Sequence, residues 1–397
     1  MIKRTLQELC LNITDGKHGD CENEENSGYY FISCKDIFDG QINYKNARQI
    51  TKADFEETHK RTMLEVDDIL LTNSGTIGRM AFVTDREATT KTTFQKSVAI
   101  IKPDKQKVLP RYLYYQLQNC VPQFINSSNG SAQKNLLLST MRTFQIEIEE
   151  NREKQEKIAN TLSAYDDLIE NNQKQIKLLE EAAQRLYKEW FVDLRFPGHE
   201  NTKIVDGVPE GWSKSTVGNI CKLRKVVITP DKIESNTPYI GLEHMPRNDI
   251  CLSTWGKSEE INSNKFIYLK KDVLFGKIRP YFHKVGFALN DGITSTDTMV
   301  MVADQNLWGL LLVTVSSDAF VDFSYQNCKE GAKMPRADWK QMEKYAIMIA
   351  DQATQKLFEQ EILVITNKIS ALAFQCRSLR EARDRMLPKL MGGEVKV

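Results

Sequence analysis

The sequence has no long apolar segment, and this absence excludes a membrane-spanning helix. No stretch of the 397 residues approaches the run of about 18 consecutive apolar residues that such a helix needs. Its first residues, Met1-Ile2-Lys3-Arg4, lead into no apolar segment of the kind found in signal peptides. We therefore expect a soluble, cytoplasmic protein without a membrane partner.

Metal-ligand spacings are also missing. The eight cysteines stand singly with no C-x-x-C pair, which argues against a zinc ribbon and against a disulfide framework. The five histidines are His18, His59, His199, His244 and His283. None has a second ligand at a metal-binding distance in the sequence, so we expect no metal site and reduced structural thiols.

Motifs for catalysis are equally scarce. Gly256-Lys257-Ser258 resembles the end of a phosphate-binding loop, but Cys251 stands where the first glycine should be. Pro103-Asp104 and Pro230-Asp231 are not followed by the acid-x-Lys of a magnesium-dependent nuclease, and no N-P-P-[FY] motif for base methylation is present. We expect no catalytic residue and no cofactor in this chain.

What the sequence does contain is an apolar spacing of alternately four and three residues, present twice. A 3.5-residue period over more than four heptads is typical of a coiled-coil seam and exceeds what a surface helix needs. The first set is Ile158, Leu162, Tyr165, Ile169, Asn172, Ile176, Leu179, Ala183, Leu186 and Trp190. The second set is Phe358, Ile362, Ile365, Ile369, Leu372, Cys376, Leu379, Arg383, Met386 and Leu390.

Two arrangements would bury these seams: each helix packs on its own domain, or the two helices pack on each other. The best-matched partner for each seam in this chain is its duplicate. Because a globular segment of similar size precedes each helix, we favour an antiparallel intramolecular pair with a domain at either end. About 32 residues at about 1.5 Å per residue would make a spacer of roughly 48 Å.

An antiparallel pair also predicts which residues meet, because matched residue numbers then sum to about 548. The expected neighbours are Trp190 with Phe358, Asn172 with Cys376, and Arg383 with Tyr165, Asp166 and Asp167. Asn172 is a polar residue in an apolar seam. We expect it to fix the register at some cost in stability.

The repeat extends upstream of the helices to about residue 3. Gly130, Met141, Phe144 and Ile146 match Gly331, Met342, Tyr345 and Ile347, and Asp68-Ile69-Leu70 matches Asp272-Val273-Leu274. Short β-branched and aromatic runs, interrupted by Gly, Asn, Asp and Pro, make up most of both segments. They predict two mainly β domains of the same fold.

Basic residues are concentrated at corresponding places in both repeats, although the net charge is only +1. Nine Lys or Arg stand against three acids between residues 79 and 134, and six stand against Asp272 alone between residues 265 and 288. One such stretch is usually a solvated face. Its recurrence in both repeats favours a DNA-binding surface.

Several segments resemble those of type I restriction-modification specificity subunits. They are Asp68–Gly78 (DILLTNSGTIG), Asp272–Val285 (DVLFGKIRPYFHKV), Asn151–Ala159 (NREKQEKIA), Leu186–Phe191 (LYKEWF) and Val208–Trp212 (VPEGW). The resemblance covers the whole chain. The first domain lacks the Pro-x-Gly-Trp opening, and the second has Lys-Ile-Arg-Pro near the place of Gly75-Thr76-Ile77-Gly78. This difference argues against assuming that both domains read the same bases.

The resemblance implies an α+β fold with an internal repeat and a pseudo-two-fold axis, in which an antiparallel two-helix coiled coil separates two mixed, mainly β target-recognition domains. The expected bounds are 1–147 for the first domain, 150–192 for the central helix, 205–347 for the second domain and 350–391 for the C-terminal helix.

The function that the resemblance implies is non-catalytic. Each domain would read one half of a bipartite site in double-stranded DNA, and the helices would set the spacing and dock two methyltransferase subunits. Restriction subunits would join the full complex. S-adenosylmethionine, magnesium and ATP would belong to these partners.

Candidate DNA contacts lie on loops after equivalent strands. They are Asn73, Ser74, Thr76 and Arg79 in the first domain and Lys277, Arg279, His283 and Lys284 in the second, together with Lys91 and Lys96 of the first basic stretch. Gly75 and Gly78 would let the backbone approach a duplex closely, and Pro280 would stiffen the second loop. A plain hairpin is the alternative interpretation of each loop.

Two other classes of function remain compatible with the sequence. One is a DNA-targeting adaptor of another defence or chromosome-associated system, which co-purification with a methyltransferase would distinguish. The other is a coiled-coil protein scaffold without DNA binding. A salt-titrated binding assay separates this class, since DNA binding weakens steeply with salt.

Overall fold

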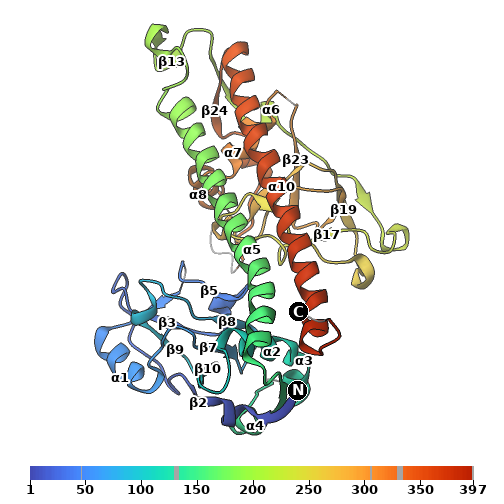
Figure 1. Ribbon diagram of the computed structural model, residues 1–397. Helices are drawn as coiled ribbons and strands as arrows, with labels where there is room; N and C mark the ends of the chain where they lie inside the picture. The colour runs from blue at the N-terminus through green and yellow to red at the C-terminus, as the bar shows by residue number, and fades with distance from the viewer. Residues whose placement is uncertain (46, 129–133, 305, 329–333, 396–397) are drawn as a thin grey trace. The chain divides into compact units, whose positions relative to one another are not determined.

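The repeated apolar spacing forms two long helices, α5 (Arg152–Tyr187) and α10 (Gln352–Met391) (Figure 1). A π-helical turn, Lys188–Val192, continues α5. The computed structural model describes residues 1–45, 47–128, 134–304, 306–328 and 334–395. Gly130 and Gly331, which the sequence repeat pairs, lie outside these residues.

The chain divides into two compact units, and each contains part of both long helices. Unit 1 comprises Met1–Asp167 and Arg380–Val397, and unit 2 comprises Leu168–Leu379. Every seam position predicted from the sequence is buried or partly buried. The seam is therefore the inward-facing stripe of both helices.

In unit 2 the two helices run antiparallel. The rings of Trp190 and Phe358 have centroids 5.6 Å apart. Further along α5, the Asn172 side-chain amide donates to Gln375 Oε1 at 3.4 Å. The contact expected between Trp190 and Phe358 is confirmed, and Asn172 lies one residue from its expected partner.

In unit 1 the pairing is again antiparallel. Arg383 donates to Asp166 at 2.5 Å, and the Tyr165 hydroxyl donates to Met386 Sδ at 3.3 Å. Asp166 also accepts from the Tyr115 hydroxyl at 2.6 Å. The expected proximity of Arg383 to Asp166 is confirmed, and Tyr115 links this pair to the β domain of the same unit.

Unit 1 is built from eleven strands and four short helices in addition to its part of the helix pair, among the residues described. The strands are β1 (Ile2–Thr5), β2 (Cys10–Asp15), β3 (Tyr30–Ile32), β4 (Ile37–Phe38), β5 (Gln41–Ile42), β6 (Arg48–Gln49), β7 (Ile69–Thr72), β8 (Met80–Phe82), β9 (Thr92–Phe94), β10 (Val98–Pro103) and β11 (Gln145–Ile148). The helices are α1 (Lys52–Thr62), α2 (Pro110–Asn119), α3 (Val121–Asn126) and α4 (Leu138–Thr143).

Unit 2 has a comparable set of elements. Its strands are β12 (Ile204–Val205), β13 (Val208–Pro209), β14 (Ser213–Thr216), β15 (Lys222–Leu223), β16 (Val227–Ile228), β17 (Tyr239–Ile240), β18 (Cys251–Leu252), β19 (Lys265–Tyr268), β20 (Val273–Gly276), β21 (Val285–Ala288), β22 (Gly292–Thr294), β23 (Thr298–Val302) and β24 (Ala346–Ile349). Its short helices are α6 (Val217–Ile220), α7 (Trp308–Val315), α8 (Asp318–Gln326) and α9 (Trp339–Met342).

The main sheets of the two units share one topology. Unit 1 contains the order β2-β10-β7-β8 and unit 2 the order β15-β23-β20-β21, extended by β18. The first strand pairs antiparallel with the last in both, as β1 with β11 and β14 with β24. A parallel pair also recurs, as β3 with β9 and β17 with β22. The predicted α+β fold with an internal repeat is confirmed.

The strands β7 and β20 lie inside their sheets, between other strands, and are buried. All four residues of β7 and of β20 are buried, as expected for short apolar runs flanked on both sides. At their starts, Asp68 accepts from Lys102 at 2.8 Å and Asp272 accepts from Arg224 at 2.8 Å. Burial raises the pKa of Asp68 to about 6, since desolvation outweighs the lysine contact.

A buried side chain of a long helix ties each β domain to the helix pair. In unit 2, Glu359 accepts the N–H groups of Gly309 at 2.6 Å and Leu310 at 3.0 Å, at the start of α7. In unit 1, Gln155 accepts the Leu109 N–H at 2.9 Å, at the start of α2. The next residue there is Pro110, which has no N–H to donate.

One short apolar run in unit 2 forms a helix. Residues 308–315 (WGLLLVTV) are apolar and β-branched, yet they form α7, in which every residue is buried. A side-chain Cβ at Gly309 would lie 2.8 Å from Glu359 Oε2 and 2.9 Å from Ile362 Cβ. The glycine therefore permits a close approach to α10 that any residue with a side chain would block.

In the described part of the chain, no helix is both long and apolar enough to cross a bilayer.

We predict that Asn172→Leu raises the melting temperature. Asn172 is 7% exposed and makes one long hydrogen bond, whereas its partner Gln375 is exposed and can bond to water instead. Leucine would extend the apolar seam at a position of this kind. Asn171→Leu, at the exposed neighbouring position, is the control and should change the melting temperature little. A lower melting temperature for Asn172→Leu alone would contradict the prediction.

Candidate nucleic-acid interface

In unit 1, three connections meet at the end of the central strand β7. The Asn73 N–H donates to Ser97 O at 3.0 Å, and the Leu136 N–H donates to Asn73 O at 2.8 Å. Ser74 also forms a bridge with Asn135. These contacts gather residues 73–79, 95–97 and 134–136 at one edge of the sheet.

Unit 2 repeats this arrangement at the end of β20. The Lys277 N–H donates to Asp297 O at 2.8 Å, and the Ala337 N–H donates to Lys277 O at 2.9 Å. Ile278 forms the bridge with Arg336 that corresponds to the one between Ser74 and Asn135. The shared bonds show that the two loops predicted from the sequence occupy equivalent places.

In each unit, a basic side chain joins a fourth connection to the three described above. In unit 1, Arg79 Nη1 donates to Cys34 O at 3.4 Å. In unit 2, Lys284 Nζ donates to Leu242 O. Cys34 is the second residue after β3, and Leu242 is the second residue after β17. We call residues 33–36, 73–79, 95–97 and 134–136 the loop cluster of unit 1, and residues 241–250, 277–284, 295–297 and 335–337 the loop cluster of unit 2.

Arg79 and Lys284 thus brace neighbouring loops, a role that sequence spacing did not reveal. Arg79 is exposed, and its other donors can face a ligand. Lys284 is half-buried, and desolvation lowers the pKa of its amine. Of the two, Arg79 is the better placed for a phosphate or base contact.

The remaining candidates on the loop of unit 1 differ in exposure. Thr76 is exposed and Ser74 is partly exposed, whereas Asn73 is only 5% exposed, and its Oδ1 is buried without a hydrogen-bond partner among the described residues. Gly75 and Gly78 have φ values of 78° and 94°. A Cβ at Gly78 would lie 2.5 Å from Val121 Cγ1, so this glycine is needed for packing as well as for conformation.

Lys91 and Lys96 lie at opposite ends of β9. Lys96 follows the strand, and its N–H donates to Lys17 O at 3.1 Å. It is exposed within the loop cluster of unit 1. Lys91 precedes the strand, at the end of a 3₁₀ turn. The structure therefore brings Lys96 together with Ser74, Thr76 and Arg79, but leaves Lys91 outside this cluster.

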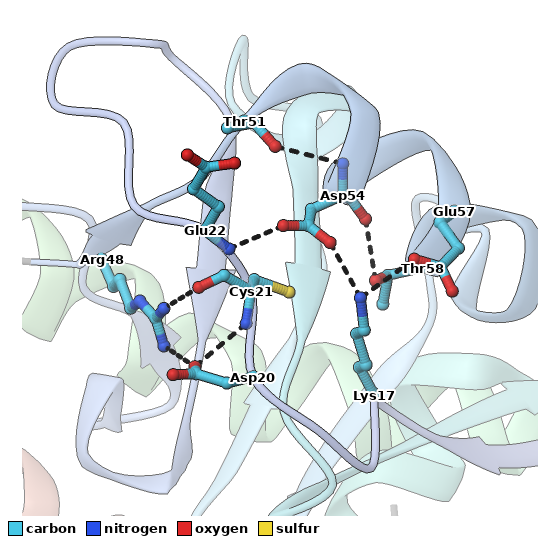
Figure 2. A network of polar contacts seen from close by, with 9 residues as sticks. All are labelled: Lys17, Asp20, Cys21, Glu22, Arg48, Thr51, Asp54, Glu57 and Thr58. Atoms are coloured by element: carbon cyan, nitrogen blue, oxygen red, sulfur yellow. Dashed lines mark hydrogen bonds and ion pairs between the residues drawn. The ribbon is translucent and has the colours of Figure 1, made fainter.

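A polar network holds the segment that supports Lys96 (Figure 2). Lys17 Nζ donates to Asp54 Oδ1 at 2.8 Å and to Glu57 Oε2 at 3.0 Å on α1. The Glu22 N–H donates to Asp54 Oδ2 at 2.6 Å. The bond from Lys17 holds the pKa of Asp54 below its usual value. Lys17 is therefore committed to the fold, in contrast to Lys96.

Arg48 completes the network from β6. Its guanidinium donates to Asp20 at 2.5 Å and also to the carbonyl oxygen of Cys21 (Figure 2). The connection after β2 is thereby fixed to both α1 and β6. This loop is acidic, and its one lysine, Lys17, is paired with α1, so it adds no unpaired lysine to the loop cluster of unit 1.

In unit 2, Lys277 and Arg279 are partly exposed. Lys277 Nζ donates to Thr296 O at 2.7 Å, and desolvation lowers the pKa of its amine. Arg279 has a φ of 51°, unusual for a residue with a side chain, and its Nε is buried without a partner among the described residues. Strained residues of this kind are concentrated at functional sites.

His283 faces the protein rather than the loop surface. Its Nε2 lies 2.8 Å from Ser316 O, and its Nδ1 lies 3.3 Å from Asp318 Oδ1, at the turn between α7 and α8. The imidazole side chain is 12% exposed. These contacts fix the end of the 277–284 loop.

Four exposed basic residues in the loop clusters were not singled out from the sequence as contacts. They are Lys35 and Lys134 in unit 1 and Arg247 and Arg336 in unit 2. Arg336 is paired with Asp297 at 2.9 Å. These residues lie far from the candidate loops in sequence and reach them only through the tertiary contacts above. Among the described residues, no group of three His, Cys, Asp or Glu is placed to hold a metal ion.

Comparison with known proteins finds a matching domain model and similar proteins. Residues 3–181 match the model described as the type I restriction modification DNA specificity domain. The chain is 26% identical to the type I restriction enzyme MjaIX specificity subunit of Methanocaldococcus jannaschii, over 92% of this chain and 87% of that protein. It is 28% identical to the EcoBI specificity subunit of Escherichia coli, over 43% of this chain and 35% of that protein.

A solved structure shares the fold. The crystal structure of the type I restriction-modification S subunit from M. genitalium superposes with a TM-score of 0.56 at 16% identity, covering 98% of this chain and 95% of that one. The sequence resemblance is thereby confirmed: residues 3–181 match the type I restriction modification DNA specificity domain, and nearly the whole chain is similar to a type I restriction enzyme specificity subunit.

Proposed function

We propose that each loop cluster reads one half of a bipartite DNA site and that the chain carries out no chemistry itself. The observation that carries this proposal is the same four-loop arrangement built twice in one chain, each time with basic residues at its surface. A protein that reads a single contiguous site needs one such surface.

The side chains of the loops suit two kinds of contact, one to the DNA phosphates and one to the base edges. Lys and Arg contact phosphates, which fixes position on the duplex, while Ser, Thr and Arg side chains can bond to base edges in the major groove. Unit 1 presents Ser74, Thr76, Arg79 and Lys96, whereas unit 2 presents Lys277, Arg279 and Arg247. Because these sets differ, the two half-sites should differ in sequence.

We further propose that α5 and α10 set the number of base pairs between the half-sites. The seam fixes the register of the two helices, so helix length rather than any DNA-contacting residue would determine the gap. The helices would also dock two methyltransferase subunits, and restriction subunits would complete the complex. S-adenosylmethionine, magnesium and ATP would be bound by these partners.

The first test is the double substitution Lys277→Ala with Arg279→Ala. It should weaken DNA binding by the assembled complex and lower the salt dependence, because each lost phosphate contact reduces the slope of log K against log salt by about 0.9. A lost bidentate base contact should cost roughly 1 to 3 kcal/mol. Binding is measured by salt-titrated fluorescence anisotropy.

Lys270→Ala with Lys271→Ala is the matched control. It removes the same charge from the other end of β20. Like the test variant, it also places one alanine at a residue with positive φ, because φ is 72° at Lys271 and 51° at Arg279. Both control lysines are exposed. If the first double variant folds and binds with unchanged affinity and slope, Lys277 and Arg279 do not contact DNA.

A second test shortens both helices by one heptad. Deleting residues 172–178 with 370–376 preserves the seam and removes about 10 Å of helix, at about 1.5 Å per residue. At about 3.4 Å per base pair this is at most roughly three pairs. Methylome sequencing of cells carrying the shortened chain and its methyltransferase should show the same half-sites with a smaller gap.

Deleting 172–178 alone is the control, since it puts the two seams out of register and should abolish methylation. Methylation by the doubly shortened chain at the original gap would refute the spacer role. Altered half-site bases would instead show that the helices take part in base recognition.

A further inference from the structure

An exposed arginine in the loop cluster of unit 2 is stacked on an aromatic ring. The guanidinium carbon of Arg247 lies 3.8 Å from the centroid of the Phe282 ring. Arg247 comes from the connection after β17, whereas Phe282 belongs to the loop after β20. The two loops thus meet through a cation–π contact, which restricts the orientation of the guanidinium.

The ring beneath Arg247 is itself supported. Phe282 packs against Tyr281 with centroids 4.9 Å apart, and Tyr281 packs against Tyr325 of α8 at 5.2 Å. Tyr281 is 46% exposed and Tyr325 is 47% exposed. Exposed aromatic side chains have an apolar cost in a protein with no partner at that surface. The ring contacts support Phe282 beneath Arg247.

The hydrogen-bonding groups of Arg247 have no partner in the part of the chain that the structure describes. Among the described residues it makes no hydrogen bond and no ion pair, although other arginines of unit 2 do: Arg224 bonds to Asp272 at 2.8 Å, and Arg336 bonds to Asp297 at 2.9 Å. A guanidinium whose face is covered by a ring still has its N–H donors along its edge. Those donors remain available to a ligand.

Two hydrogen bonds between the loops place Arg247 beside the candidate DNA contacts. The Asn248 N–H donates to His283 O at 3.1 Å, and Lys284 donates to the carbonyl oxygen of Leu242 in the same loop. Arg247 therefore lies in the segment that is bonded to the 277–284 loop on both sides. Its position is set by the same contacts that assemble the loop cluster.

We propose that Arg247 reads a guanine in the half-site recognised by unit 2, with Phe282 as the residue that positions it. This rests on the proposed function. A guanidinium edge of fixed orientation matches the two acceptors, O6 and N7, that guanine presents in the major groove. A phosphate contact would not require the plane to be fixed, since a phosphate accepts from many directions. Residues 33–47, after β3 in unit 1, contain no arginine, so this recognition is specific to one half-site.

The test is methylome sequencing of cells that carry the full-length chain with its methyltransferase. For Arg247→Ala, one guanine position in one half-site should become degenerate, with discrimination there falling about ten- to a hundredfold, while the other half-site is unchanged. Arg247→Lys keeps the charge but not the paired donors, so the same position should become degenerate while total methylation is better retained. Arg195→Ala, an exposed arginine of unit 2 outside the loop cluster, is the control and should leave the motif unchanged.

Phe282 is tested separately because its role is indirect. Phe282→Leu should relax the same guanine position although Arg247 is present, and Phe282→Tyr, which keeps a ring, should restore discrimination. Melting temperatures of the purified variants identify any that fail to fold, in which case the comparison rests on the Arg247→Lys and Phe282→Tyr variants.

Three results would overturn the proposal. An unchanged motif in both Arg247 variants would mean that Arg247 reads no base. A uniform loss of methylation at an unchanged motif, restored by Arg247→Lys, would assign Arg247 to a phosphate. If the wild-type chain directs methylation to no motif at all, the proposed function itself fails, and the role of Arg247 fails with it.

Discussion

Burial of one apolar seam, shared between two helices of the same chain, is the constraint on which the rest of the structure depends. In unit 2 the seam joins Trp190 to Phe358, and in unit 1 Arg383 pairs with Asp166 beside it. Neither helix could bury its stripe alone. Since the helices are far apart in sequence, their pairing requires the domain between them to bring the start of α10 back to the end of α5.

The helix pair also determines how the β domains are held. Glu359 caps the start of α7 and Gln155 caps the start of α2, so one buried acceptor on a long helix orients the first helix that follows the central sheet in each unit. The central strands β7 and β20 then end at the loop clusters. A rigid scaffold that presents variable loops allows one fold to present different side chains in its two copies.

Periodicity and repetition made much of this fold predictable. The 3.5-residue spacing identified both long helices and, through an antiparallel register, the contact between Trp190 and Phe358. Asp68-Ile69-Leu70 and Asp272-Val273-Leu274 located the central strands and therefore the loops after them. Residues 308–315 were harder, because a short buried apolar run has no polar face and so no period that separates helix from strand.

The candidate site was less predictable, because it depends on contacts between segments distant in sequence. Sequence placed Lys277, Arg279 and His283 on one loop, but it could not show that the His283 ring is bonded to Ser316. Nor could it single out Arg247, whose stacking on Phe282 joins two loops 35 residues apart. Composition identifies basic segments, whereas only tertiary structure shows which cations are paired internally and which face outward.

The most direct test of the account is methylome sequencing of cells that contain the chain and its methyltransferase, compared with cells that lack the chain alone. The account predicts one methylated motif made of two different half-sites at a fixed gap, lost when the chain is absent. A single contiguous motif, or methylation that persists without the chain, would contradict the claim that its two loop clusters choose the DNA site.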